Sequence, residues 1–122
     1  MEKCLETARL FLRRLELGDA DRVEELASDY ELAKTTLNVP HPYPEGSAAD
    51  FILSMWAAEE KGLVAFAVVE KESESLIGII NIKQTIAYKR GELGYWIGRP
   101  YWGKGYGTEA ARAMVAYGFV TL

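Results

Sequence analysis

The sequence predicts an α/β fold of the α+β sandwich type, in which a mostly antiparallel sheet is flanked by helices. The prediction rests on a change of pattern along the chain. Helical patterns precede residue 62 and follow residue 107, whereas residues 63–69 and 76–82 are two apolar runs rich in valine and isoleucine. Only the charged segment from Glu70 to Ser75 separates these runs, which indicates an antiparallel hairpin at the centre of the fold.

Length and composition indicate a single domain spanning residues 1–122. Hydrophobic residues make up 49% of the chain and charged residues 26%, the balance of an ordinary globular protein with a substantial core. Charged residues interrupt every apolar stretch, so no segment can span a bilayer, and the first residues lack the apolar centre of a signal peptide. A single cysteine permits no internal disulfide. These features predict a cytoplasmic protein with no membrane contact.

Charge and metal-ligand content exclude two other classes. The formal net charge of −4 argues against a nucleic-acid-binding protein, which usually carries a basic stripe. The chain has one histidine, His41, and one cysteine, Cys4, too few for the usual zinc sites. We therefore expect no metal and no nucleic-acid partner.

The N-terminal half is expected to begin with a strand over residues 8–15, where apolar and basic residues mix. Gly18 then breaks the chain, and Asp19 is predicted to cap a helix from Ala20 to about Ser28. Further helical turns are expected from Tyr30 to Leu37. The proline-rich segment 40–44 requires an irregular loop, because each proline removes a donor and restricts the preceding residue.

The remaining elements follow from capping residues and periodicity. Ser47 is predicted to cap a helix that ends near Gly62 and repeats its apolar residues at helical spacing. Residues 86–88 extend the second strand of the hairpin, and Glu92 to Ile97 form another strand. The last helix is predicted from about Gly107 to Phe119.

The segment most informative about function is the loop between this last strand and the last helix. It carries glycines at positions 103, 105 and 107, with Lys104 and Thr108 beside them. Glycine allows positive φ and close approach of a ligand to the backbone. The first N–H groups of a helix lack partners within it, and the helix dipole favours negative charge there. The pattern therefore favours a phosphate or pyrophosphate site, with a tight turn that binds nothing as the alternative.

Two other phosphate-binding motifs do not fit this segment. A P-loop needs four residues between its first glycine and Gly-Lys-Ser/Thr, and that spacing is absent. Residues 105–110 match G-x-G-x-x-A, the dinucleotide pattern. That pattern belongs to a parallel β-α-β unit with an acidic residue about twenty positions later, and the sequence ends before that position.

The segment from Gly94 to Ala110 resembles the acetyl-CoA-binding motif of the GNAT superfamily, Gln/Arg-x-x-Gly-x-Gly/Ala. Trp102 occupies the place of the Gln or Arg, as is common in the branch that acetylates ribosomal-protein N-termini and in related small-molecule acetyltransferases. That branch is also similar to this chain in Arg9-Leu10-Phe11-Leu12-Arg13-Arg14, in Gly18-Asp19-Ala20 and in Pro42-Tyr43-Pro44. The resemblance thus covers nearly the whole chain.

The resemblance implies the GNAT acyl-CoA N-acyltransferase fold and an enzyme that transfers an acetyl group from acetyl-CoA to a primary amine, either a protein N-terminus or a small molecule. It implies that the backbone amides of the loop hold the CoA pyrophosphate and that the preceding strand lies along the pantetheine arm. For the side chains of Tyr95 and Trp96, core packing is an equal alternative. The cofactor-binding residues implied are Tyr95, Trp96, Ile97, Trp102, Gly103, Lys104, Gly105, Tyr106, Gly107 and Thr108.

Glu92 is the candidate general base, because related enzymes often carry an acidic residue near the thioester. Alternation along the strand places Glu92 on one face with Gly94 and Trp96. A carboxylate there can remove a proton from the attacking amine directly or through water. A solvated glutamate at the end of a strand is the alternative interpretation.

The family fold continues beyond the last predicted helix with a strand, a helix and a closing hairpin, which these 122 residues do not include. We therefore expect an incomplete domain, whose alternative function is that of a remnant that binds acyl-CoA weakly or only self-associates. A strand edge over residues 92–97 and a last helix with unburied Met114 and Val115 would favour a homo-oligomer.

Overall fold

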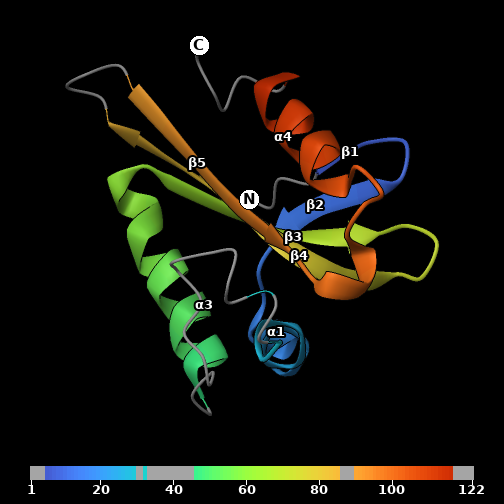
Figure 1. Cartoon of the computed structure of the whole chain (residues 1–122). Coiled ribbons are helices and arrows are strands. Elements are labelled where there is room, and N and C mark those ends of the chain that lie inside the picture. The colour runs from blue at the N-terminus through green and yellow to red at the C-terminus, as the bar shows by residue number, and fades with distance from the viewer. Residues whose placement is uncertain (1–4, 30–31, 33–45, 86–89, 117–122) are drawn as a thin grey trace.

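Five strands form one sheet in the order β1-β2-β3-β4-β5, and each strand is antiparallel to its neighbours (Figure 1). The computed structural model describes residues 5–29, 32, 46–85 and 90–116, with the backbone alone at 83–85 and 90–93. The strands are β1 (Leu5–Glu6), β2 (Leu10–Arg14), β3 (Leu63–Glu70), β4 (Ser75–Thr85) and β5 (Arg90–Ile97). The described sheet is thus antiparallel throughout rather than mixed.

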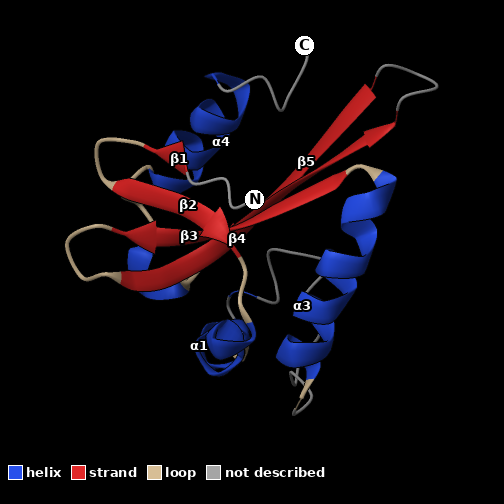
Figure 2. Ribbon diagram, turned by 180° about the vertical axis from the view of Figure 1, so that it is seen from behind, coloured by secondary structure: helices blue, strands red, loops and turns tan. Residues whose placement is uncertain are grey.

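The helices cover both faces of this sheet (Figure 2). α1 (Ala20–Ala27) and α3 (Ser47–Ala58) pack on one face, and α4 (Tyr106–Ala116) packs on the other. Short 3₁₀ turns, η1 (Leu17–Asp19), η2 (Glu59–Lys61) and η4 (Arg99–Tyr101), join elements at the edges of these layers. In the part of the chain that the structure describes, no helix is long and apolar enough to cross a membrane.

Each face of the sheet has its own hydrophobic cluster. The cluster under α4 includes Leu10, Leu12, Phe66, Ile80 and Met114. The cluster under α1 and α3 includes Leu15, Val23, Ile52, Ala67 and Ile79. These residues are apolar positions of the predicted strands and helices, and successive residues of each strand bury their side chains on opposite faces of the sheet. The predicted central hairpin is confirmed as β3–β4.

A bulge in β4 shapes the end of the sheet that leads to the glycine-rich loop. Val68 pairs with Gly78 and Val69 with Leu76, so Ile77 is an extra residue opposite β3. The carbonyl of Ile77 accepts the N–H of Gly98, just beyond β5, at 2.7 Å. A Cβ on Gly78 would lie 2.3 Å from the carbonyl oxygen of Trp96, so the close approach of β4 and β5 here requires glycine.

One predicted helix cap is confirmed in position, and the other is wrong. Asp19 is the N-cap residue of α1, but its side chain makes no capping hydrogen bond. Its carboxylate instead accepts Arg13 at 2.8 Å and the N–H of Glu16 at 2.8 Å. Burial raises the pKa of Asp19, but these hydrogen bonds outweigh it and leave the pKa below its ordinary value. Ser47 is already inside α3, whose N-cap is Gly46 in the left-handed conformation.

Other sequence predictions differ from the structure in extent. The predicted first strand, residues 8–15, is the shorter β2, and the residues before it form β1 as its antiparallel partner. Met114 and Ile97 are buried in the core rather than left at an open surface, whereas Val115 is exposed. The expected helical turns at 30–37 fall outside the described residues except for Leu32, and the loop at 40–44, the strand extension at 86–88 and residues 117–119 fall outside entirely.

Candidate acyl-CoA site

The chain leaves β5 through a loop that folds back over the end of the strand. Gly98 is held to the β4 bulge, and η4 follows directly. The indole N–H of Trp102 then donates to the carbonyl of Ile97 at 2.5 Å. This bond fixes the beginning of the glycine loop, defined here as residues 103–108, against the last residue of β5.

Two glycines of the loop adopt backbone conformations that other residues avoid. Gly103 has φ of +78° and Gly105 has φ of +80°. The N–H of Glu109 donates to the carbonyl of Gly105 at 3.0 Å, which is the first bond of α4. The amides of residues 106–108 therefore precede the first hydrogen bond of the helix and lie at the positive end of its dipole.

The glycine loop borders an open cavity of about 400 Å³ that continues along the end of β5. The ring of Tyr95 lies across the start of α4, because a Cβ on Gly107 would come within 2.5 Å of its Cε2. Tyr95 is nevertheless 50% exposed. The residues that line the cavity are Leu32, Tyr95, Trp96, Ile97, Tyr101, Trp102, Gly103, Gly105, Tyr106, Gly107 and Thr108.

The structure brings the predicted cofactor-binding residues together, with one exception. All of them border this cavity except Lys104, whose side chain is exposed. Trp96 also packs on the α1–α3 face, and Ile97 is buried under α4, so core packing and a place beside the cavity coexist for these side chains. Their roles in binding stay a prediction.

Tyr106 contributes to the site through its backbone, since its side chain turns into the core. The phenol is buried and donates to Oε2 of Glu70 at 2.6 Å. This bond, together with burial, raises the pKa of the Tyr106 phenol. The same bond and one from Ser73 hold the pKa of Glu70 below its ordinary value, and the charge of Lys104 adds to the effect.

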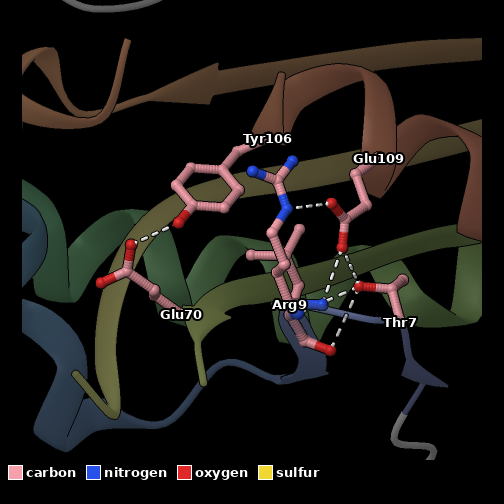
Figure 3. A network of polar contacts seen from close by, with 6 residues as sticks. Thr7, Arg9, Glu70, Tyr106 and Glu109 are labelled. Atoms are coloured by element: carbon pink, nitrogen blue, oxygen red, sulfur yellow. Dashed lines mark hydrogen bonds and ion pairs between the residues drawn. The ribbon is translucent and has the colours of Figure 1, made fainter. Parts of the chain in front are cut away.

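A second carboxylate, that of Glu109, joins the first turn of α4 to the turn between β1 and β2 (Figure 3). Glu109 accepts the backbone N–H of Arg9 at 3.0 Å, the Nε of Arg9 at 2.6 Å and the hydroxyl of Thr7. Burial would raise the pKa of Glu109, but these hydrogen bonds outweigh it and keep the pKa below its ordinary value.

Glu92, the candidate base, lies in β5 opposite Lys83. The register pairs Gly94 with Asn81 and Trp96 with Ile79. Glu92 is therefore an alternate residue of the strand with Gly94 and Trp96, on the same face of the sheet. Its side chain lies outside the described residues. At roughly 3.3 Å per residue, Glu92 is about 17 Å along the strand from Ile97, the last residue of β5.

Sequence reasoning missed several residues that build the site. Tyr101 lines the cavity, and its hydroxyl accepts Nη2 of Arg22 from α1 at 2.9 Å. Thr7 and Arg9 fix the start of α4 through hydrogen bonds to Glu109, about 100 residues away in the sequence. The Arg9-Leu10-Phe11-Leu12 pattern marked this strand, but nothing in the pattern indicates that Arg9 meets Glu109.

Comparison with known proteins identifies the relatives of this arrangement. The family model described as the acetyltransferase (GNAT) domain matches residues 9–122. An uncharacterized N-acetyltransferase, p20 of Bacillus licheniformis, is 35% identical over 121 residues, which covers 97% of this chain and 67% of the relative. A Bacillus subtilis (strain 168) protein provisionally named ribosomal N-acetyltransferase YdaF is 28% identical over 127 residues, covering 100% of this chain and 68% of YdaF.

A solved structure gives the same result in three dimensions. The GNAT-family acetyltransferase from Bacillus anthracis superposes with a TM-score of 0.80 and 26% identity, covering 96% of this chain and 66% of that chain. The present chain thus spans about two thirds of the length of the relatives it matches. With a family match over nearly its full length and an N-acetyltransferase relative above 30% identity, this chain belongs to the GNAT acetyltransferase family.

Proposed function

We propose that this chain binds acetyl-CoA and transfers the acetyl group to a primary amine. One observation carries the proposal: the glycine loop offers the amides of residues 106–108 at one end of a cavity that continues along β5. A diphosphate bound to these amides would leave the rest of an elongated cosubstrate lying along residues 95–97. This geometry suits an acyl-CoA better than a free phosphate.

The backbone of β5 supports the path of the pantetheine arm. The carbonyl of Trp96 points toward β4, as its 2.3 Å approach to a Cβ on Gly78 requires. Backbone polar groups of successive strand residues point to opposite sides, so those of Tyr95 and Ile97 point away from β4. The carbonyl of Ile97 already accepts the indole of Trp102 on that side. The N–H of Tyr95 is then available to an amide of the pantetheine.

Glu92 is our candidate for the general base. The acceptor amine must be neutral to attack the thioester carbonyl, and a carboxylate can accept its proton directly or through water. Glu92 is about 17 Å along β5 from the end of the strand that leads to the glycine loop, which fits a reacting group at the far end of a long ligand whose phosphates are held at residues 106–108. A free N–H of β5 would stabilise the oxyanion that forms when the amine attacks.

The acceptor belongs to the class of primary amines. YdaF is provisionally named for ribosomal acetylation. Structures that share the fold alone are named as a ribosomal-protein-S5-alanine acetyltransferase from Vibrio fischeri and as a spermidine N-acetyltransferase chimera from Vibrio cholerae and hSSAT. We propose a protein N-terminus or a small amine as acceptor, in the cytoplasm, with no nucleic acid or membrane as partner.

Two measurements test this function. Calorimetry with acetyl-CoA should show one site per chain, and a thiol-release assay with peptide and polyamine acceptors should show turnover. Binding without turnover would favour the alternative of a non-catalytic acyl-CoA-binding module. Absence of binding at millimolar acetyl-CoA would refute the assignment of the glycine loop.

We also propose that the chain forms homo-oligomers. β5 is at the edge of the described sheet, and Tyr95 in this strand, Trp102 after it and Val115 in α4 are exposed apolar residues. Exposed strand edges pair readily with other chains. Val115→Glu should shift the equilibrium toward the monomer in light scattering, whereas a charge at the buried Ile97 would disrupt the core instead. A parent chain that is monomeric at micromolar concentration would contradict this proposal.

A further inference from the structure

The first turn of α4 is held at two points by residues distant in the sequence (Figure 3). Tyr106 is fixed by Glu70 at the end of β3, and Glu109 is fixed by Thr7 and Arg9 in the turn between β1 and β2. The amides proposed to bind phosphate, those of residues 106–108, lie between these two attachments. Their position therefore depends on contacts outside the glycine loop.

Arg9 is the residue common to both attachments. Its Nε donates to Oε1 of Glu109 at 2.6 Å, and its guanidinium carbon lies 4.4 Å from the centroid of the Tyr106 ring. Its Nη2 would be 3.6 Å from a Cβ on Gly105. The side chain of Arg9 thus borders Gly105, stacks on Tyr106 at the first residue of α4 and binds Glu109 at the end of the first turn.

We propose that Arg9 is a positioning residue for acyl-CoA binding, which acts through Tyr106 and Glu109 to fix the amides of residues 106–108. The proposal rests on the function proposed above for the glycine loop. Donors held in place before a ligand arrives bind it more tightly than donors that must be ordered on binding.

The chain contains a matched control for this side chain. Arg14, the last residue of β2, also donates its Nε to a carboxylate, Oε1 of Glu59, at 2.9 Å. Its guanidinium carbon also stacks on an aromatic ring, that of Trp56, at 4.8 Å. Both arginine side chains are 44% exposed. Arg14 differs in its location, because it attaches the α3–η2 region rather than α4.

The test compares Arg9→Met with Arg14→Met in the full chain. Arg9→Met keeps the backbone bond from residue 9 to Glu109 and the Thr7 bond, so we expect the domain to fold. Both variants should lose similar thermal stability, whereas only Arg9→Met should weaken acetyl-CoA binding, by about tenfold in calorimetry. Equal effects of the two variants on affinity, or no effect of either, would overturn the proposal.

A double-mutant cycle distinguishes positioning from direct contact with phosphate. If Arg9 acts through Glu109, then Glu109→Gln should itself weaken binding, and adding Arg9→Met should cost much less than it does alone. If Glu109→Gln strengthens binding and the two effects add, Arg9 acts as a simple charge and the proposal is wrong.

Hydrogen exchange provides a measurement that needs no ligand. The Glu109 amide, bonded to Gly105, should exchange faster in Arg9→Met than in the parent, and should be unchanged in Arg14→Met. Equal exchange in all three chains would overturn the positioning role. If the parent fails to bind acetyl-CoA but shows this exchange pattern, the proposed function fails while the role of Arg9 in fixing the first turn stands.

Discussion

Two helices of this protein start in nearly the same way and differ in what surrounds them. α3 follows Gly46, with φ of +83°, and α4 follows Gly105, with φ of +80°. In each case the fourth residue after the glycine is acidic and donates its N–H to the glycine carbonyl, at 3.2 Å for Asp50 and 3.0 Å for Glu109. Asp50 is exposed, whereas Glu109 is bound by Thr7 and Arg9 from the turn between β1 and β2.

The comparison shows that a glycine before a helix is insufficient to mark a site. Local sequence gives both helices unpaired amides and a dipole at their N-termini. Of these two helices, α4 starts beside the cavity along β5, and hydrogen bonds to residues distant in the sequence fix its first turn. The three predictions that follow use α3 as the internal control for α4.

The largest expected effect is that of a β-branched residue in the loop. Gly105→Val imposes a side chain on a backbone with positive φ and blocks approach to the amides, so acetyl-CoA binding should become undetectable by calorimetry. Gly46→Val imposes a comparable backbone strain at α3 and should leave the dissociation constant within about twofold. Similar losses of affinity in both variants would remove the distinction between the helices.

The next effect concerns catalysis. Glu92→Gln preserves shape but cannot accept a proton, so kcat should fall by about a hundredfold with little change in affinity for acetyl-CoA. Asp50→Asn makes the same chemical change at the start of α3 and should leave kcat unaltered. The pH–rate profile is the decisive measurement, and a Glu92→Gln profile identical to that of the parent would exclude Glu92 as the base.

The smallest effect is a change in acid stability. The pKa of Glu109 is lower in the folded chain than its ordinary value, so the unfolded chain binds more protons in acid. The stabilisation by Glu109 is therefore complete above the ordinary carboxyl pKa and is lost as pH falls through the folded pKa. Glu109→Gln should flatten the loss of unfolding free energy between roughly pH 5 and pH 2. In urea unfolding experiments at a series of pH values, Asp50→Asn should lose stability in acid as the parent does. If the parent and both variants lost unfolding free energy equally with falling pH, the stabilising role of the Glu109 carboxylate would be wrong.

The sequence predicted features that depend on neighbouring residues. The runs at 63–69 and 76–82 predicted the β3–β4 hairpin, and glycines at 103, 105 and 107 predicted the loop before α4. The single extra residue Ile77 escaped prediction, because one inserted residue in a continuous apolar run leaves its pattern unchanged.

The capping bonds and the long-range ion pairs could not be predicted, for a common reason. Local sequence places Asp19 at the start of α1, but its carboxylate binds Arg13 and the N–H of Glu16 instead of the first amides of the helix. Arg9 and Glu109 are distant in the sequence, and the packing of α4 on the sheet brings them together. Residue type indicates which groups can pair, and the tertiary structure decides which of them do.

The bond between Arg9 and Glu109 also has a consequence for the order of folding. It joins residues separated by 100 positions, whereas the β3–β4 and β4–β5 pairs join segments that are adjacent in the chain. Closing so long a loop costs more chain entropy than forming a hairpin, so local pairs should form before the distant one. Refolding should therefore restore the β-sheet signal before it restores the capacity to bind acetyl-CoA. Recovery of acetyl-CoA binding would then mark the late step of folding in which Arg9 meets Glu109 at the start of α4.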